Sequence, residues 1–178
     1  MITKQAAGEI GALYVFGQLL KRGAVAYLPL VDEGVDALVR TLTGNVIELQ
    51  IKSAGSAGGN YSRWFQVVAI NSKKNLFVIG VEFSLGEPVN AWVFPSTVFD
   101  KYANRPARGT PRDLDLDMGT RKYGMPLRDL LCGFRNRWEL ITSYEQYESL
   151  LESPEDLEDI LTMKESLESP EEEAKTLQ

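Results

Sequence analysis

The stretch from Glu33 to Ser53, "EGVDALVRTLTGNVIELQIKS", constrains the fold of this chain more than any other segment. Apolar and polar residues alternate along both of its halves, and a Thr-Gly-Asn turn separates them. Such alternation is typical of a strand with one buried face, and two such runs joined by a short turn predict an antiparallel hairpin. We expect its two strands at residues 35–42 and 46–53.

One face of this predicted hairpin carries an unusual set of polar side chains. Asp36 lies near the start of the first strand, and Gln50 and Lys52 lie two residues apart in the second. Because the strands run antiparallel, Asp36 and Lys52 should meet at the same end of the hairpin. Glu48 shares this face, and we expect it to point into solvent, although it is also a candidate ligand.

The composition limits the chemistry that such a site can perform. The chain of 178 residues has no histidine and one cysteine, Cys132. Without histidine it cannot form a Ser-His-Asp triad, a Cys-His pair or a histidine-ligated zinc site. Hydrolytic chemistry would therefore need carboxylates, lysine and a hard metal ion with oxygen ligands. We expect Cys132 to be a small buried apolar residue.

The remaining sequence predicts an α/β (α+β) fold with a mixed central sheet flanked by helices. Helices are expected at residues 4–22, at 126–134 and from the cap at Ser143 to about Leu151. Further strands are expected at 24–30, 63–70, 75–83, 90–95 and 137–141. Residues 100–125 lack clear periodicity and predict a long excursion from the core. We assign residues 1–151 to one domain and residues 152–178 to an acidic helical tail.

The first predicted helix carries a glutamate on an otherwise apolar stripe. Glu9, Leu13, Phe16 and Leu20 have the spacing of one helix face, which we expect to face the core. A buried glutamate is costly unless a positive group meets it, and Lys52 or a metal ion are the candidates.

A convergence of Glu9 with Asp36 would favour a cation between them. Two carboxylates about 4 Å apart repel by roughly 4 kcal/mol at an effective dielectric of 20. One of them would take up a proton, or a divalent cation would bind. Gln50 and the main-chain carbonyl of Ile51 can add neutral oxygen ligands, and Lys52 could hold a nucleophilic water or a substrate phosphate.

The spacing "GVD…(13 residues)…QIK" resembles the PD-(D/E)XK nuclease superfamily, in the branch where glutamine replaces the acid of the second motif. Such variants are similar to intron-associated homing endonucleases, resolvase-like proteins and bacterial nuclease-like domains. The resemblance covers about residues 4–100 and implies a restriction-endonuclease-like core. Val35 stands where the proline of the motif would be.

The resemblance also implies a role for each residue of the site. Asp36 matches the metal-binding aspartate, Gln50 the position of the second acid and Lys52 the catalytic lysine. Glu9 matches the glutamate of the first helix that completes the metal site in resolvase-like members. The implied ligands of Mg²⁺ or Mn²⁺ are therefore Glu9, Asp36, Gln50 and Ile51. Gln50 removes one negative charge, which weakens metal affinity unless Glu9 or Glu48 restores it.

These features predict a metal-dependent DNA endonuclease. The alternatives are a catalytically inactive nucleic-acid-binding or assembly module with the same fold, and a protein-interaction partner whose acidic tail mimics nucleic acid. Superfamily members commonly act as dimers to cut two strands, which makes a homodimer an open alternative to a monomer. No signal peptide and no apolar run of roughly 20 residues are evident, so we expect a cytoplasmic protein without a membrane partner.

The charge is unevenly distributed along the chain. The net charge is −6, yet residues 145–178 hold twelve acidic and two basic groups, which leaves +4 on residues 1–144. Such asymmetry is typical of some nucleic-acid-binding proteins, although a solvated acidic helix is the commoner explanation of such a run. Candidate contacts to nucleic acid, each with a structural alternative in the core or in a solvated loop, are Arg63, Trp64, Arg105, Arg108, Arg112, Arg121 and Lys122.

Overall fold

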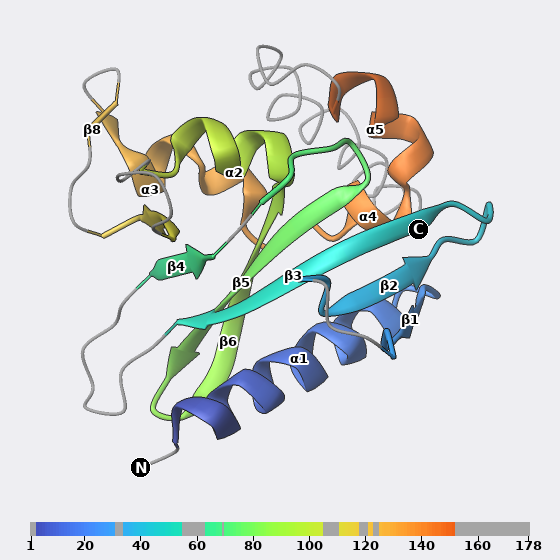
Figure 1. Ribbon diagram of the computed structural model, residues 1–178, viewed down its shortest axis with the longest axis horizontal. Helices are drawn as coiled ribbons and strands as arrows, with labels where there is room; N and C mark the ends of the chain where they lie inside the picture. The colour runs from blue at the N-terminus through green and yellow to red at the C-terminus, as the bar shows by residue number, and fades with distance from the viewer. Residues whose placement is uncertain are drawn as a thin grey trace, which may run out of the picture.

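The computed structural model describes residues 3–30, 34–54, 63–68, 70–104, 111–117, 121–122 and 125–151. A five-stranded sheet crosses the molecule in the order β1-β2-β3-β5-β6 (Figure 1). Its strands are β1 (Val25–Tyr27), β2 (Ala37–Arg40), β3 (Val46–Ala54), β5 (Leu76–Ser84) and β6 (Glu87–Pro95). Strands β3 and β5 are parallel and the other neighbours are antiparallel, so the predicted mixed sheet is confirmed.

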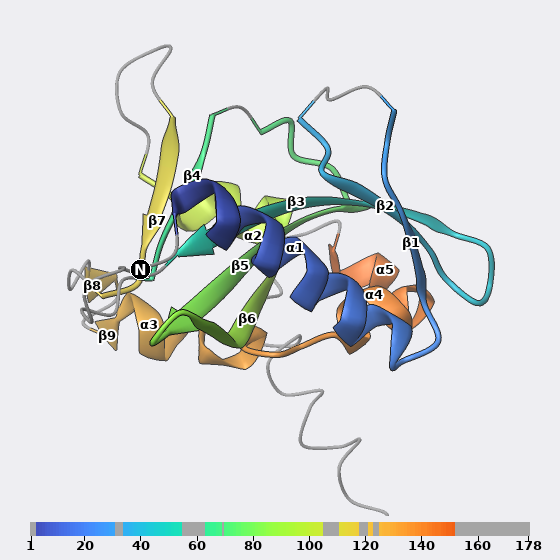
Figure 2. The ribbon, with the colours of Figure 1, turned by 90° about the horizontal axis from the view of Figure 1, so that it is seen from below.

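Helix α1 (Lys4–Leu20) covers one face of this sheet, as seen from below in Figure 2. The helix begins at Thr3, whose hydroxyl accepts a hydrogen bond from the Ala6 backbone N–H. Its buried residues are Gly11, Val15 and Leu19, spaced four residues apart. Gly11 lies directly against Ser53 of β3, where a methyl group would clash with the serine hydroxyl. The glycine therefore sets the close approach of α1 to the sheet.

The expected orientation of the first helix was wrong. Of the stripe predicted to face the core, Glu9 is exposed, and the side chains of Leu13 and Leu20 are 68% and 59% exposed. Phe16 is only partly buried. The helix instead contacts the sheet through the side that carries Gly11, because small residues allow the two backbones to approach.

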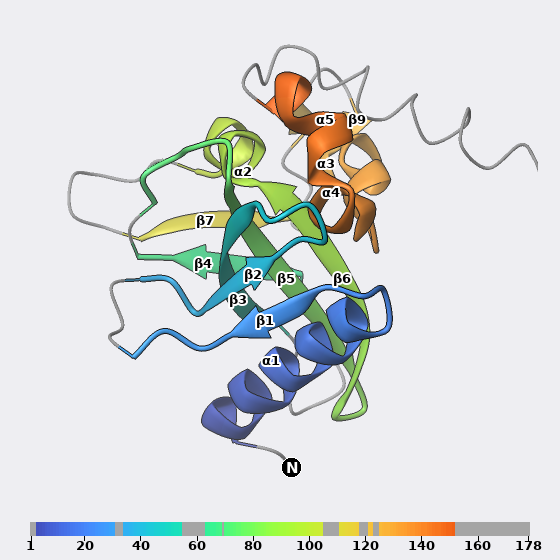
Figure 3. The ribbon, with the colours of Figure 1, turned by 90° about the vertical axis from the view of Figure 1, so that its right-hand side faces the viewer.

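The opposite face of the sheet is covered by a separate two-stranded ribbon and a helix, which Figure 3 shows from the side. The ribbon consists of β4 (Trp64–Val67) and β7 (Arg112–Asp115), paired antiparallel. Phe65 of β4 packs on Gly80 of β5, where its ring leaves no room for a β-carbon. Helix α2 (Ser96–Tyr102), which the sequence pattern did not predict, packs through Phe99 against Phe94 of β6.

Short elements follow the ribbon: β8 (Arg121–Lys122), β9 (Met125–Pro126), α3 (Leu127–Leu130), the 3₁₀ helix η1 (Cys132–Phe134), α4 (Glu139–Thr142) and α5 (Tyr144–Leu151). The helix predicted up to Leu151 is confirmed as α5, whereas the single helix predicted at residues 126–134 is divided into α3 and η1, with Leu131 between them. Helix α5 returns to the sheet, where the Tyr144 ring meets Phe77 edge-on. Cys132 is exposed, contrary to the expectation of a buried residue.

The strand predicted at residues 137–141 was also wrong, because this segment contains α4. Leu140 and Ile141 are adjacent and both fully buried, a pattern that a strand with one buried face cannot produce. Asn136, which has a positive φ of 55°, turns the chain just before this segment. Strand β1 is shorter than the predicted 24–30. The acidic tail at residues 152–178 lies outside the described residues. Among the helices of the described segments, none is long and apolar enough to cross a membrane.

Candidate active site

Asp36 lies immediately before β2, at the end of the hairpin opposite its turn. Its backbone N–H donates to the Leu49 carbonyl at 2.8 Å, which ties the residue before β2 to β3. Its Oδ2 accepts two hydrogen bonds from β3, one from the Ile51 backbone N–H at 2.6 Å and one from Lys52 Nζ at 3.3 Å. The carboxylate is therefore held across the end of the hairpin, as the strand alternation predicts.

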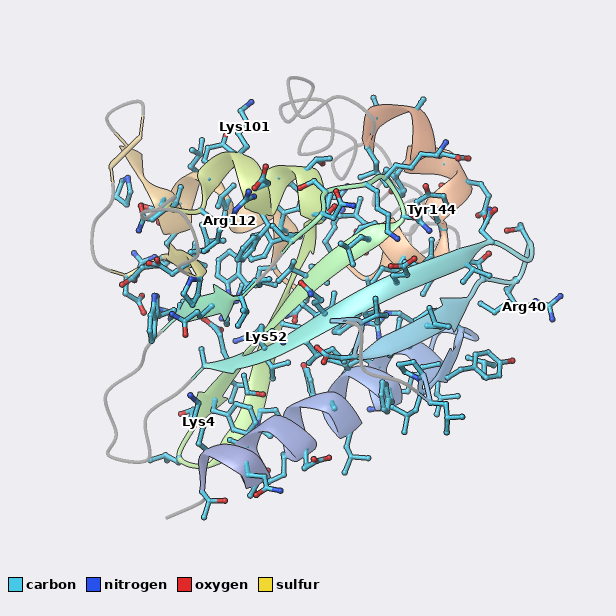
Figure 4. The ribbon with its side chains drawn as sticks, in the orientation of Figure 1. Lys4, Arg40, Lys52, Lys101, Arg112 and Tyr144 are labelled. Atoms are coloured by element: carbon cyan, nitrogen blue, oxygen red, sulfur yellow. The ribbon has the colours of Figure 1, made fainter. Side chains whose placement is uncertain are left out.

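Lys52 and Asp36 form an ion pair that solvent can reach. Their side chains are 32% and 35% exposed, and pairs of this kind typically contribute about 0–1 kcal/mol. Figure 4 shows Lys52 near one end of the hairpin and Arg40 near the other. A partly exposed ion pair of such small net strength can open at little cost. The Lys52 ammonium could then turn to a different anion.

Gln50 lies on the same face of β3 and is buried. Its Nε2 donates to the carbonyl of Gly34, the first residue of the described segment that leads into β2. Gly34 has a φ of +86°, a conformation that favours glycine. The hydrogen bond therefore fixes the amide of Gln50 beside Asp36 and the chain that precedes it.

The Ile51 carbonyl points toward the same edge of the strand as Asp36. The N–H and C=O of one strand residue share an edge, and the Ile51 N–H is directed at the Asp36 carboxylate. Strand β2 begins at Ala37, whose partner is Leu49, so Ile51 lies beyond the regular pairing. This carbonyl can therefore add a neutral oxygen next to the carboxylate.

The structure does not bring Glu9 and Glu48 into this group. Glu9 is exposed on α1, and α1 contacts the sheet face that carries Ser53, opposite to the face of Gln50 and Lys52. Glu48 is on the same face as Gln50, but its carboxylate accepts a hydrogen bond from Lys73 Nζ at 2.6 Å. The described residues thus converge on one carboxylate, one amide and one ammonium.

The donors at this site match a hard divalent cation in type. Carboxylate, amide and main-chain carbonyl oxygens are the ligands that Mg²⁺ and Mn²⁺ prefer. Within the described parts of the chain, however, no three side chains of histidine, cysteine, aspartate or glutamate are grouped as for a metal ion. The described residues therefore fit such a cation by donor chemistry while contributing a single negative charge, that of Asp36.

A buried ion-pair network lies on the same sheet face and was not foreseen. Glu82 of β5 is 1% exposed, and its carboxylate accepts a hydrogen bond from Arg63 Nε. Arg63 also contacts Asp117, whose carboxylate accepts hydrogen bonds from the arginine backbone N–H at 2.7 Å and from NH1 at 2.5 Å. Arg135 NH2 lies 3.7 Å from the second Glu82 oxygen. These contacts anchor the ribbon to the sheet.

The contacts of Arg63 with two carboxylates outweigh the effect of its burial on its pKa. Burial by itself lowers the pKa of Arg63, but hydrogen bonds and ionic contacts with Asp117 and Glu82 raise it overall. The sequence contained a signal for this network, because Glu82 is an acid within the apolar run "NLFVIGVEF". A buried carboxylate in such a run requires a cationic partner.

The candidate nucleic-acid contacts divide into different environments. Trp64 is 45% exposed on the ribbon, so the alternative of a core position does not hold. Arg112 pairs with Asp100. The structure does not describe Arg105 and Arg108, nor the side chains of Arg121 and Lys122.

One comparison with known proteins supports the fold. The structure is similar to that of a bacterial homing endonuclease, I-Ssp6803I, with a TM-score of 0.59 and 22% sequence identity. The similarity covers 84% of this chain and 99% of that one. No protein-family model matches the sequence, and no curated protein matches it. At this level of identity the similarity establishes a shared fold: a mixed α/β core of the kind found in that nuclease.

Proposed function

We propose that this chain is a metal-dependent DNA endonuclease that hydrolyses phosphodiester bonds at the Asp36–Gln50–Lys52 site. The observation that carries the proposal is the contact between Asp36 and Lys52 beside the buried Gln50 at one end of the hairpin. An acidic group, a neutral oxygen donor and an ammonium on one strand face are the parts that hard-metal hydrolysis needs. The shared fold with a homing endonuclease supports the same function.

In this proposal Asp36, Gln50 and the Ile51 carbonyl hold Mg²⁺ or Mn²⁺. When bound, such an ion stabilises negative charge on the phosphate and makes a coordinated water more acidic. The Lys52 ammonium leaves Asp36, binds an oxygen of the scissile phosphate and orients the attacking water. The main-chain N–H of Ile51 keeps the carboxylate in position. Glu9 stays a predicted further ligand. It is exposed on α1, and no ion pair joins it to a cationic side chain of the described residues.

Cleavage assays with a matched lysine control test this proposal. The wild-type protein should nick or cut supercoiled, linear or branched DNA when Mn²⁺ or Mg²⁺ is present. Lys52→Ala should reduce the rate by about 10²–10³-fold, the usual effect of removing one group that stabilises charge in the transition state. Lys73→Ala removes the ion pair with Glu48 on the same sheet and should cleave normally. Equal loss in both lysine variants would contradict the assignment of Lys52.

The second candidate function is a catalytically inactive nucleic-acid-binding or assembly module. Gln50 favours this second function. It places a neutral amide where the nuclease motif has its second acid, so Asp36 is the one acid among Asp36, Gln50 and Lys52. DNA binding by the wild-type protein without cleavage of any substrate, in Mn²⁺ as well as Mg²⁺, would support this function. A homodimer and a cytoplasmic location stay predictions under both proposals.

A further inference from the structure

The outward face of the β4–β7 ribbon presents an unusual pair of side chains. Residues of β4 alternate, with Phe65 and Val67 buried and Trp64 and Gln66 exposed. Trp64 is 45% exposed, whereas Trp92 and Trp138 are 2% and 1% exposed. A large aromatic surface and an amide therefore lie next to each other on the side of the ribbon that faces away from the core.

Trp64 is held in a defined position on a well-anchored element. Its indole Nε1–H donates to Asp113 on the neighbouring strand at 3.1 Å. The preceding residue, Arg63, binds the buried Glu82 and also Asp117, which follows β7. An exposed ring that is fixed in this way loses little conformational entropy when a partner packs against it.

The ribbon lies beside the proposed active site. Phe65 packs on Gly80, with ring atoms 2.6–2.7 Å from the point where a β-carbon would stand. Gly80 is the register partner of Lys52 on the parallel strand β3. Strand β4 accordingly lies next to the C-terminal part of β3 in Figures 1 and 3. A substrate that reaches Lys52 passes close to the ribbon.

We propose that this face of the ribbon contacts the bases of the DNA substrate, with Trp64 stacking on a base and Gln66 bonding to a base edge. Stacking on aromatic side chains is a common means of holding nucleic acid, because every base has an aromatic face. Glutamine can bond to the edge of adenine, and a two-stranded ribbon fits the major groove. The inference rests on the proposed function and adds the surface that selects the substrate.

The charge of the face indicates bases rather than phosphates as its partners. Asp113 and Asp115 stand opposite Gln66 and Trp64 in the ribbon register, so both lie on the outward face. Two carboxylates there repel a phosphate backbone. The groups on this face that can attract DNA are therefore the Trp64 ring and the Gln66 amide, and both are suited to contact bases.

Intrinsic fluorescence tests the inference directly. The full-length wild-type protein is titrated in EDTA, so that no cleavage occurs, with a duplex and a single-stranded oligonucleotide that carry a fluorescent label. Label anisotropy reports binding, and acrylamide quenching reports the exposure of tryptophan. Because Trp92 and Trp138 are buried, the quenching of free protein reports mainly Trp64. Bound DNA should protect this tryptophan from acrylamide, and the comparison of the two oligonucleotides shows whether paired or unpaired bases are contacted.

Variants on the same face give an independent measurement. Trp64→Ala should weaken DNA binding by about 5- to 150-fold, the range found for loss of one stacked base. Tyr27→Ala removes a similarly exposed aromatic residue on β1 and should leave affinity unchanged. Asp115→Asn keeps the shape and removes one negative charge, so it should tighten binding at low salt. Thermal melts of all three variants show whether each is folded.

Three outcomes separate the inference from the proposed function. DNA binding with tryptophan protection, weakened by Trp64→Ala and tightened by Asp115→Asn, supports both. DNA binding with unchanged acrylamide quenching, and unchanged affinity in both ribbon variants, overturns the inference and leaves the endonuclease proposal standing. If no oligonucleotide binds to the wild-type protein at any salt concentration, the proposed function and the inference both fail.

Discussion

The β2–β3 hairpin carries a polar cluster at each end, and the two clusters are built from different groups. At the turn, Glu145 of α5 accepts hydrogen bonds from Thr43, from Asn45 at 2.6 Å and from Thr41 at 3.0 Å. At the other end, Asp36 meets a main-chain N–H and Lys52. Neutral donors surround one carboxylate, whereas the other has an ionic partner.

The difference separates a structural contact from a reactive one. The hydrogen bond from Thr43, helped by those from the Glu145 main chain, Asn45 and Thr41, lowers the pKa of Glu145 to about 2. This carboxylate stays ionised and joins α5 to the turn at every ordinary pH. The ion pair of Asp36 and Lys52 is partly exposed, so Asp36 can bind another cation and Lys52 can bind another anion. Only the second arrangement leaves charged groups available to a substrate.

The largest expected effect that distinguishes the two ends is stabilisation by metal. A ligand at 100 times its dissociation constant stabilises a protein by roughly 2.7 kcal/mol, and at this size each kcal/mol raises the melting temperature by about 2–4 °C. Mn²⁺ or Mg²⁺ should therefore raise the melting temperature of the wild-type protein by several degrees. Asp36→Ala should abolish the rise, whereas Glu145→Ala at the turn should retain it. Differential scanning fluorimetry measures both.

Glu9 enters the same experiment as a candidate ligand. A reduced rise in Glu9→Ala would show that it reaches the metal, and an unchanged rise would remove it from the site. If wild type and Asp36→Ala gain the same stabilisation, the metal binds elsewhere and the contrast between the two ends of the hairpin disappears.

The second prediction concerns the support of the site end by the ribbon. Gly80→Ala would force the Phe65 ring away from the sheet beside Lys52, and overpacking of this kind typically costs about 1–3 kcal/mol. Gly17→Ala is the control, because apart from its own helix backbone no atom lies within 4 Å of the point where its β-carbon would stand, and alanine favours a helix. Urea denaturation should show Gly80→Ala destabilised and Gly17→Ala unchanged or more stable. Similar stability of both variants would contradict the close contact.

The core of the candidate site could be predicted because it depends on local pairing. Strand alternation and a short turn fix which residues share a face, and antiparallel pairing then places Asp36 next to Lys52. The same reasoning located the strands that became β3 and β5. The mixed main sheet and the likeness to a nuclease fold agree with the predicted fold class.

The orientation of α1 was predicted wrongly for a different physical reason. Helix α1 carries large apolar residues on more than one side, and Gly11, which has no side chain, lies directly against Ser53 of the sheet. The spacing of the bulky apolar residues therefore indicated the face of Leu13 and Leu20, which is exposed. Small residues at a helix–sheet contact give no signal in such a pattern.

The pairing of the ribbon could not be predicted from periodicity, although β4 lies within the strand predicted at residues 63–70. Trp64 pairs with Asp115, and residues 68–111 separate the two strands along the chain. Local patterns describe neither such distant pairing nor the position of the ribbon on the sheet. The buried Glu82 indicated that a cation was needed, but the identity of its partner, Arg63, depends on this pairing.

The third prediction addresses the turn end and is smaller. Glu145→Ala removes the acceptor shared by Thr41, Thr43 and Asn45, and the net loss for a surface cluster should be about 1 kcal/mol. Glu148→Ala on the same helix removes an exposed ion pair with Lys74 and should cost less. DNA cleavage should be unaffected in both variants. A loss of cleavage in Glu145→Ala with the fold intact would show that the two ends of the hairpin are coupled.

The smallest effect is the dependence of stability on pH that the Glu145 cluster adds. The pKa of Glu145 is about 2 in the folded protein, below the ordinary value of 4.5 for an unfolded chain. The folded state therefore binds the proton less readily, so the contribution is fully present above about pH 4.5 and is lost as the pH falls toward 2. Solvent exposure of the carboxylate reduces its size. Urea denaturation of wild type and Glu145→Gln at pH 6 and pH 3 measures the contribution. The glutamine variant keeps an oxygen acceptor but does not titrate, so the stability difference between the two proteins should shrink between pH 6 and pH 3. A constant difference would mean that the charge of Glu145 contributes nothing, and that the turn is held by hydrogen-bond geometry alone.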